Sequence, residues 1–407
     1  MSSDRLYYTD SYLIEFDAAV RDIVKQGDRW IATLDRTAFY PTSGGQPFDT
    51  GTLGAATVVD VFDQEDGTVG HAIDRELERN SRVRGHVDWD RRFDHMQQHT
   101  GQHLLSAAFD KELGAKTVGF HLGTTSATID LDKELLAEHI AAGEAVANTV
   151  LWEDRETCVT FVTASEAAKL PLRKDPTRQG DLRIIEIKGY DLSACGGTHV
   201  SRTGAIGMIA VVGFEKFKGG TRLEFVCGRR ALRAYRGLRD AVNGGVRLLS
   251  VLPEELPSAI EKLQTASKAQ QKTHEALHAR LATHEASALA AKGQKIGSVT
   301  LVAEALLGWD ASGLKKLASA ITSNPGMVVV LVTSESPSLV VVARSQDLAL
   351  DTGTVLKALL ERFGGKGGGK GSMAQGGGLS GATADILAAG REAAFPEDKE
   401  PSGAPTR

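Results

Sequence analysis

Residues 93–109, with the sequence FDHMQQHTGQHLLSAAF, decide how the rest of the chain is interpreted. The spacing of apolar residues predicts a helix. Its apolar stripe consists of Phe93, Met96, Leu104, Leu105, Ala108 and Phe109. His99 and His103 are four residues apart, so both imidazoles would project from one face of that helix. Two histidines do not complete a tetrahedral metal site, so we looked elsewhere in the chain for further ligands.

The segment DLSACGGTH, residues 191–199, supplies two more candidate ligands, Cys195 and His199, in a loop bent by glycines. A cysteine thiolate and three imidazoles are ligand types that zinc prefers. We therefore predict one zinc ion bound by His99, His103, Cys195 and His199. His95 lies one turn before His99 and could compete as a ligand, support the ligands from behind, or lie on the surface. No glutamate follows His99, which excludes the HExxH arrangement of metalloproteases.

Composition places the chain among ordinary globular proteins. Its 407 residues, 42% hydrophobic and 24% charged, predict two to four domains. The net charge of −5 does not indicate a nucleic-acid binder, although a basic patch could be local. Three cysteines argue against a disulfide framework and for a reducing compartment. Without an apolar leader or a membrane-length apolar run, we expect a cytoplasmic protein.

The overall fold class that we expect is multidomain α+β. Residues 1–90 contain several short β-rich segments separated by turns and predict a small β-barrel. The glycine-rich loop over residues 37–51 lies inside it and, on composition alone, is a plain hairpin loop. Residues 91–245 predict an α+β domain with helices at 93–114 and 133–150. Its strands are expected at 126–131, 159–162, 182–187, 206–212 and 221–227.

The most basic stretch is residues 215–240, with eight lysines or arginines against three acidic residues. Arg229, Arg233 and Arg236 share a helical face by spacing. Contact with a phosphate backbone and an ordinary solvated helix face explain this charge equally well.

Residues 253–293 predict a long helical arm with an interrupted heptad of apolar residues, which would act as a spacer or a dimer element. Residues 297–395 predict an α/β domain, because the continuous apolar strands at 299–303, 327–332 and 339–343 are of the kind buried on both faces. Its helices are expected at 311–322 and 353–363. The tail, residues 396–407, is expected to be disordered.

A glycine-rich run at residues 364–378 is either a linker or a backbone-lined anion site. Lys366, Lys370, Met373 and Gln375 among the glycines favour the anion site.

Four motifs in order resemble one family. MQQHTGQHLLSAAF followed by CGGTHV resembles the editing domain of alanyl-tRNA synthetase and its free-standing AlaX relatives. FYPTSGGQPFDTG resembles the glycine-rich loop of that family's N-terminal barrel, and GGTRLEFVCGRRAL the end of its editing domain. GGKGGGKGSMAQGGG resembles the C-terminal signature shared with DHH-family phosphoesterases. Because the barrel begins by about residue 10, we expect no class II aminoacylation domain and a long-form AlaX protein.

This resemblance implies a C-terminal domain of the DHH-associated type and hydrolysis, in trans, of mischarged tRNA(Ala). The substrate would be chiefly Ser-tRNA(Ala), and perhaps also Gly-tRNA(Ala), cleaved at the ester to the 3′ adenosine. The four predicted zinc residues match the family's ligands. The residues expected to contact tRNA are Gly44, Gly45, Gln46, Arg222, Arg229, Arg230, Lys366, Lys370 and Gln375. The resemblance places a serine-sensing hydroxyl after the histidine helix.

The catalytic residue itself remains open at this point. The candidates near the expected position are Gln102, Thr117, Thr125 and Thr128. No general base stands out, and zinc would either activate water or hold the substrate. Alternatives are a non-catalytic zinc-containing tRNA-binding protein, a subunit of a synthetase complex, and a DHH-type oligonucleotide phosphoesterase. The phosphoesterase needs an Asp-His-His cluster, for which Asp94-His95-Met96 is the nearest match. A homodimer through the arm or the C-terminal domain is also possible.

Overall fold

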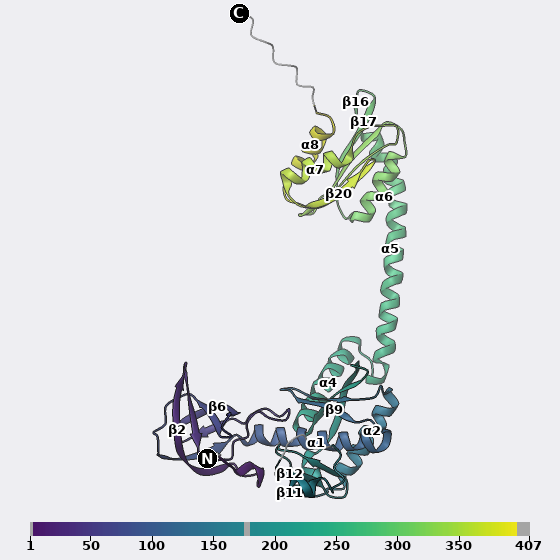
Figure 1. Cartoon of the computed structure of the whole chain (residues 1–407). Helices are drawn as coiled ribbons and strands as arrows, with labels where there is room; N and C mark the ends of the chain where they lie inside the picture. Colours follow the sequence, from purple (N-terminus) through teal and green to yellow (C-terminus); the bar gives the residue numbers. More distant parts are fainter. Residues whose placement is uncertain (1–2, 175–179, 397–407) are drawn as a thin grey trace, which may run out of the picture. The chain divides into compact units, whose positions relative to one another are not determined.

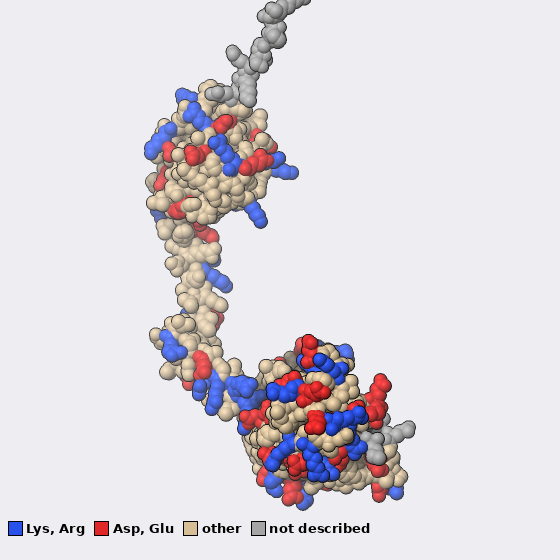
Figure 2. Space-filling model, turned by 90° about the vertical axis from the view of Figure 1, so that its left-hand side faces the viewer, with Lys and Arg blue, Asp and Glu red and all other residues tan. Residues whose placement is uncertain are grey.

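The structure, a computed structural model, describes residues 3–174 and 180–396 and divides into two units, residues 1–245 and 246–407 (Figure 1). The predicted disordered tail lies outside the described residues except for Pro396. No helix among the described residues is long and apolar enough to cross a membrane. Basic and acidic side chains are interspersed on the face that Figure 2 shows.

The N-terminal part is a closed six-stranded β-barrel, as predicted, with strand order β2-β3-β7-β6-β5-β8. Alternate residues of β2, such as Phe16, Ala18 and Val20, are buried in its core, the pattern of a strand with one solvated face. The strands and the short helix of this region are β1 (Asp4–Arg5), η1 (Leu6–Tyr8), β2 (Glu15–Gln26), β3 (Arg29–Leu34), β4 (Arg36–Thr37), β5 (Gly51–Leu53), β6 (Ala56–Asp63), β7 (Val69–Ile73) and β8 (Arg82–Val87).

Helix α1 (Trp89–Leu113) connects the barrel to the second half of this unit (Figure 1). Asp88 caps its first turn, and Gly114 ends it in the left-handed conformation that glycine adopts without strain. Arg92 is fully buried and pairs with Asp49 of the barrel at 2.5 Å. A buried charge needs such a partner, so this ion pair fixes the helix against the barrel loops.

Two sheets and further helices complete the first unit. The sheet orders are β14-β15-β10-β9 and β11-β12-β13. The elements are β9 (Thr117–Leu122), β10 (Ala127–Leu131), α2 (Ala137–Trp152), β11 (Thr157–Val162), α3 (Ala164–Ala167), β12 (Leu182–Ile187), β13 (Asp191–Ala194), η2 (Thr203–Ile206), β14 (Ile209–Phe217), β15 (Gly220–Cys227) and α4 (Gly228–Leu249). The core is formed by the apolar face of α1 with α2 and the larger sheet.

Two predicted boundaries in this unit are wrong. The helix predicted from Lys133 begins only at Ala137, because Thr221 bonds the backbone of Lys133 and Leu135 and holds that segment beside β15. The strand predicted over 206–212 begins at Ile209, after a short 3₁₀ turn through Ile206.

The second unit contains the predicted long helix and α/β domain. Its sheet order is β16-β17-β18-β19-β21-β20. The elements are η3 (Pro253–Glu255), α5 (Leu256–Lys292), β16 (Gln294–Ile296), β17 (Val299–Leu306), α6 (Ala311–Thr322), β18 (Met327–Thr333), β19 (Ser338–Arg344), α7 (Thr352–Phe363), β20 (Lys366–Lys370), β21 (Met373–Leu379) and α8 (Thr383–Ala394). One face of the sheet packs against α6 and the end of α5, and the other against α7 and α8. Burial on both faces explains the continuous apolar strands.

The glycine-rich run forms neither a linker nor a loop. Strands β20 and β21 make an antiparallel hairpin at the edge of the sheet. A Cβ at Gly367 would lie 2.4 Å from the carbonyl oxygen of Gln375, so only glycine allows the two backbones to pair this closely. Binding of anions by this hairpin stays a prediction.

The arm helix α5 is 37 residues long and exposes most of its predicted apolar seam. The exposed members are Ile260, Leu263, Leu277 and Leu281. A dimer through this seam stays a prediction.

Candidate metal centre

Helix α1 supplies His99 and His103 from one face, as the spacing predicts. Both residues are buried, with 3% of each exposed. The side chains on either side of them in the helix are buried as well, so the helix passes through the interior of the unit. A buried rod of this kind fixes the direction of both imidazoles.

The loop after β13 brings Cys195 and His199 to the same place. Gly197 lies directly against α1, and a Cβ there would be 2.1 Å from Cε1 of His99. Only a residue without a side chain therefore allows the loop to close on the helix. The CGG sequence is explained by this contact as well as by the bend of the loop.

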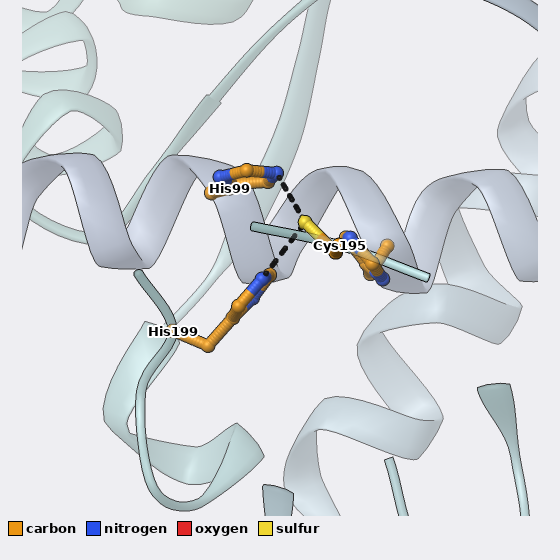
Figure 3. Close-up of side chains that lie close together, drawn as sticks. His99, Cys195 and His199 are labelled. Carbon is orange, nitrogen blue, oxygen red and sulfur yellow. Dashed lines mark hydrogen bonds between the residues drawn. The ribbon is translucent and has the colours of Figure 1, made fainter. Parts of the chain in front are cut away.

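The four predicted ligands form one cluster, although they come from segments about a hundred residues apart. Their candidate ligand atoms all lie within 4.8 Å of one another. The sulfur of Cys195 is 3.4 Å from Nε2 of His99 and 3.4 Å from Nε2 of His199 (Figure 3). This arrangement can bind a metal ion such as zinc.

Each histidine of the cluster has a hydrogen-bond partner on its other ring nitrogen. Nδ1 of His99 is 2.8 Å from Oε1 of Gln46, and Nδ1 of His103 is 2.8 Å from Oδ2 of Asp191. Nδ1 of His199 is 3.2 Å from the hydroxyl of Thr100. A carboxylate or amide oxygen accepts the proton of Nδ1, which leaves Nε2 as the free electron-pair donor. The donor set and its supporting partners therefore fit a metal ion.

Electrostatics also favour a thiolate in this cluster. Burial alone would raise the pKa of Cys195, but the neighbouring imidazoles of His99 and His199 outweigh it and hold the pKa well below its usual range. Burial lowers the pKa of His199 to about 3. Burial would also lower the pKa of His103, but its hydrogen bonds to Asp191 and Cys195 raise it to about 9. Metal ligands must be deprotonated, so a bound metal ion would displace the proton that His103 otherwise carries.

Asp191 is the most strongly held carboxylate beside the cluster. Arg173 pairs with it at 2.7 Å, and Ser193 donates a further hydrogen bond. Burial opposes ionisation, but His103 and Arg173 hold the pKa of Asp191 well below its usual range. Asp191 is therefore an anion that orients His103. Sequence reasoning missed this role, although Asp191 opens the motif that contains Cys195.

Gln46 also has a role that sequence reasoning missed. It is fully buried, and besides His99 it contacts Thr198, whose hydroxyl accepts from Nε2 at 2.9 Å. Gln46 thus connects the barrel loop to both halves of the cluster. Its backbone neighbour Gly45 has φ +84°, and a Cβ there would lie 2.7 Å from the carbonyl oxygen of Phe120. The glycine pair lets the barrel loop pack against β9, while Gly44 lines the cavity described next.

A cavity of about 520 Å³ opens beside the cluster. Among its lining residues are Tyr8, Tyr40, Gly44, His99, Gln102, His103, Thr117, Phe120, Arg183 and Cys195. Gln102 and Thr117 both donate to the hydroxyl of Ser106, at 2.7 and 2.6 Å. Thr125 is exposed and Thr128 lies in β10, and neither lines this cavity.

His95 does not belong to the cluster. It is 4% exposed, which excludes the surface position considered above, and burial lowers its pKa to about 3. Its Nδ1 has no hydrogen-bond partner among the described residues.

Each of the three arginines predicted to contact tRNA forms an ion pair with an aspartate. Arg230 is buried and forms bidentate hydrogen bonds with Asp94, while Arg222 pairs with Asp130 at 2.7 Å. Arg229 is exposed and pairs with Asp90. Lys366 and Lys370 are exposed at the two ends of β20, and Gln375 lies in β21. Their contact with tRNA stays a prediction.

Comparison with known proteins now identifies the family. The alanyl-tRNA editing protein AlaX-L of Pyrococcus horikoshii is 31% identical over 389 residues, which cover 92% of this chain and 94% of that protein. The chain belongs to the AlaX-L family of alanyl-tRNA editing proteins. The resemblance and the fold class predicted from the motifs are confirmed.

Other relatives of this AlaX-L family member are longer. Alanine–tRNA ligases of Pyrococcus abyssi and Haloquadratum walsbyi are each 33% identical, over 387 and 396 residues. The matches cover 91% and 94% of this chain but only 41% and 43% of the ligases. The chain thus spans about two-fifths of the length of these curated relatives.

Three family patterns match parts of the chain. "Threonyl and Alanyl tRNA synthetase second additional domain" matches residues 182–224, which include Cys195 and His199. "DHHA1 domain" matches residues 298–394, and "tRNA synthetases class II (A)" matches residues 4–91. Among solved structures, the C-Ala domain of Aquifex aeolicus alanyl-tRNA synthetase is 20% identical, with a TM-score of 0.24, over 25% of this chain and 96% of that domain.

Proposed function

We propose that this chain is a trans-editing hydrolase that deacylates mischarged tRNA(Ala). Ser-tRNA(Ala) is the principal substrate and Gly-tRNA(Ala) a second one, and the scissile bond is the ester to the 3′ adenosine. The observation that carries this proposal is the cluster of three histidines and one cysteine, of which His99, His103 and Cys195 line a cavity that Thr117 also lines. The name of the Pyrococcus horikoshii relative supports the same conclusion.

The chemistry of alanine selection explains why such an enzyme is needed. A synthetase pocket for alanine cannot exclude the smaller glycine and rejects one added hydroxyl only weakly. A second site that hydrogen-bonds the serine hydroxyl would discriminate better, because its own polar groups stay unpaired when alanine binds.

We propose zinc as the metal, held by His99, His103, Cys195 and His199. When bound, the ion supplies positive charge that polarises the ester carbonyl or orients the substrate. The residues behind the cluster keep the rings in place: Gln46, Thr100 and Asp191 hold Nδ1 of the three histidines. We assign no general base to this chain, so water is the nucleophile.

Thr117 is our candidate for the serine sensor, because it alone of the three candidate threonines lines the cavity. Its hydroxyl donates to Ser106, which leaves its oxygen free to accept a hydrogen bond from the hydroxyl of a bound serine. Gln102, which donates to the same Ser106, keeps that hydroxyl in place.

The glycine hairpin of the second unit and Arg229 supply contacts to the tRNA phosphates in this proposal. Lys366 and Lys370 are exposed and free of any ion pair among the described residues, which suits a phosphate contact. We place the protein in the cytoplasm, where its three free cysteines stay reduced.

The direct test is release of amino acid by purified, zinc-loaded protein from Ser-, Gly- and Ala-tRNA(Ala). We expect rapid release of serine, slower release of glycine and little release of alanine. Equal hydrolysis of all three, or of none, would contradict the proposal. Thr117→Val should lower the preference for serine over alanine by roughly tenfold or more. The matched control is Thr125→Val, which should keep the preference for serine over alanine because Thr125 does not line the cavity.

The alternatives give different outcomes in the same experiment. Tight tRNA binding without turnover would support a non-catalytic tRNA-binding protein. Cleavage of short oligonucleotides would support a DHH-type phosphoesterase. One observation argues against the phosphoesterase. The candidate metal cluster among the described residues consists of three histidines and one cysteine, whereas a DHH-type enzyme needs an Asp-His-His cluster, and His95 is buried but is not part of the cluster.

A further inference from the structure

Arg183 has an unusual set of contacts beside the metal centre. It lies in β12 and is 7% exposed. Nη1 donates to the carbonyl oxygens of Cys195 and Gly197, both at 2.8 Å, and Nε donates to the carbonyl oxygen of Tyr8 at 2.9 Å. These three bonds hold the guanidinium rigidly against the loop that carries two of the metal ligands.

The remaining nitrogen of this guanidinium is unsatisfied. Nη2 is buried and has no hydrogen-bond partner among the described residues. Within residues 3–174 and 180–396, Arg183 also forms no ion pair with a carboxylate. The other buried or half-buried arginines around the cavity differ, since Arg5 pairs with Asp63 at 2.6 Å and Arg173 with Asp191 at 2.7 Å.

A buried guanidinium without a carboxylate partner is costly, and a buried N–H without an acceptor adds to that cost. Because Arg183 lines the cavity, an anionic ligand in the cavity would remove both penalties. The centroid of the Tyr8 ring lies 5.5 Å from the guanidinium carbon, and Tyr8 lines the same cavity. Because Nη2 is buried, a ligand reaches it only when a neighbouring side chain shifts.

We infer that Arg183 is an anion-binding residue of the editing cavity and takes the 5′-phosphate of the substrate's terminal adenosine. This inference rests on the proposed function, which places an ester of that adenosine at the metal cluster. Arg183 bonds the backbone carbonyl of Cys195, so an anion held by Arg183 would lie beside the cluster. In the substrate, one ribose separates the ester from the 5′-phosphate, so the two groups are close enough to bind at neighbouring sites.

The first experiment measures binding without chemistry. The zinc-loaded full-length chain is titrated with AMP and with adenosine by calorimetry. Charge-assisted hydrogen bonds to phosphate should make AMP bind about 10- to 100-fold more tightly. Arg183→Gln should abolish this preference, and Arg183→Lys should keep part of it. The matched control Arg5→Gln removes a cation that already has a carboxylate partner and should change the preference less than about 3-fold.

Equal affinity of the wild-type chain for AMP and adenosine would overturn the inference, as would an unchanged preference in Arg183→Gln. Zinc content and thermal unfolding identify a variant whose loop has collapsed. If the loop collapses in Arg183→Gln, the Arg183→Lys variant tests the inference instead. A folded lysine variant that keeps the full wild-type preference for AMP over adenosine would contradict the assignment.

The second experiment separates this inference from the proposed function. It compares hydrolysis of 3′-O-seryl-adenosine with hydrolysis of its 5′-phosphate. We expect a lower KM for the phosphorylated ester in the wild-type chain and equal KM values in Arg183→Gln. A variant that merely loosened the loop would lose both substrates alike. Equal hydrolysis of the two esters by the wild-type chain would refute the phosphate site and leave the editing function. A preference for AMP over adenosine without hydrolysis of either ester would refute the editing function and leave the phosphate site.

Discussion

The metal cluster in the first unit and the glycine hairpin in the second are both short sequence motifs, but they are built in opposite ways. The cluster consists of buried side chains, and each of its histidines is held by a partner from another segment. The hairpin consists of closely paired backbone with exposed lysines at both ends of β20. A motif of the first kind depends on tertiary contacts, whereas a motif of the second kind depends mainly on the absence of side chains.

Removing a ligand should have the largest effect. We expect Cys195→Ala to lower the zinc content to a small fraction of one equivalent and serine release by at least roughly 100-fold, because no other thiolate lies in the cluster. Metal analysis with a deacylation assay measures both. Cys158→Ala, in β11 outside the cluster, should keep full zinc. Full stoichiometric zinc in Cys195→Ala would disprove the ligand set.

Weakening a supporting partner should have the next largest effect. Asp191→Asn replaces the anion that accepts from His103 and should lower zinc affinity by roughly 10- to 100-fold. Competition with a chromogenic chelator measures this affinity. Asp130→Asn is the matched control, because Asp130 also pairs with an arginine but lies away from the cluster. Equal affinities of the two variants would mean that Asp191 does not support the metal.

Two adjacent glycines test how tightly the loop packs on α1. Gly197→Ala should destabilise the fold by about 1–3 kcal/mol, because its Cβ would overlap the His99 ring. Gly196→Ala should change stability by less than about 0.5 kcal/mol, since the nearest atom to its Cβ is 3.6 Å away. Denaturant unfolding of both zinc-loaded variants measures the difference. Indistinguishable midpoints would refute the close packing of the loop.

The hairpin should give the smallest effect and no effect on the metal. In the double variant Lys366→Ala and Lys370→Ala, the slope of log affinity for tRNA against log salt should become shallower by roughly 2. Zinc content should stay at the wild-type level. Lys357→Ala, an exposed lysine of α7 that pairs with Glu361, serves as control. An unchanged salt slope in the double variant would remove the hairpin from the tRNA contact.

The two regions also differ in how far the sequence could predict them. Ligand types and helical spacing predicted the cluster residues, since His99 and His103 occupy one face of a regular helix. Their partners could not be predicted, because Gln46 and Asp191 lie 53 and 88 residues away in the sequence from the histidines they hold. The barrel was predictable from alternating strands such as β2. Glycines carry no periodicity, so residues 364–378 gave no sign of a hairpin.

The contact between Gln46 and Thr198 spans 152 positions of the chain. During synthesis, therefore, the barrel loop leaves the ribosome long before the segment that completes its hydrogen bonds. The two halves of the cluster meet only after nearly 200 residues have been made, and contacts between such distant segments form late in folding. A nascent chain of this protein consequently lacks the assembled cluster of His99, His103, Cys195 and His199 until the loop after β13 has been made.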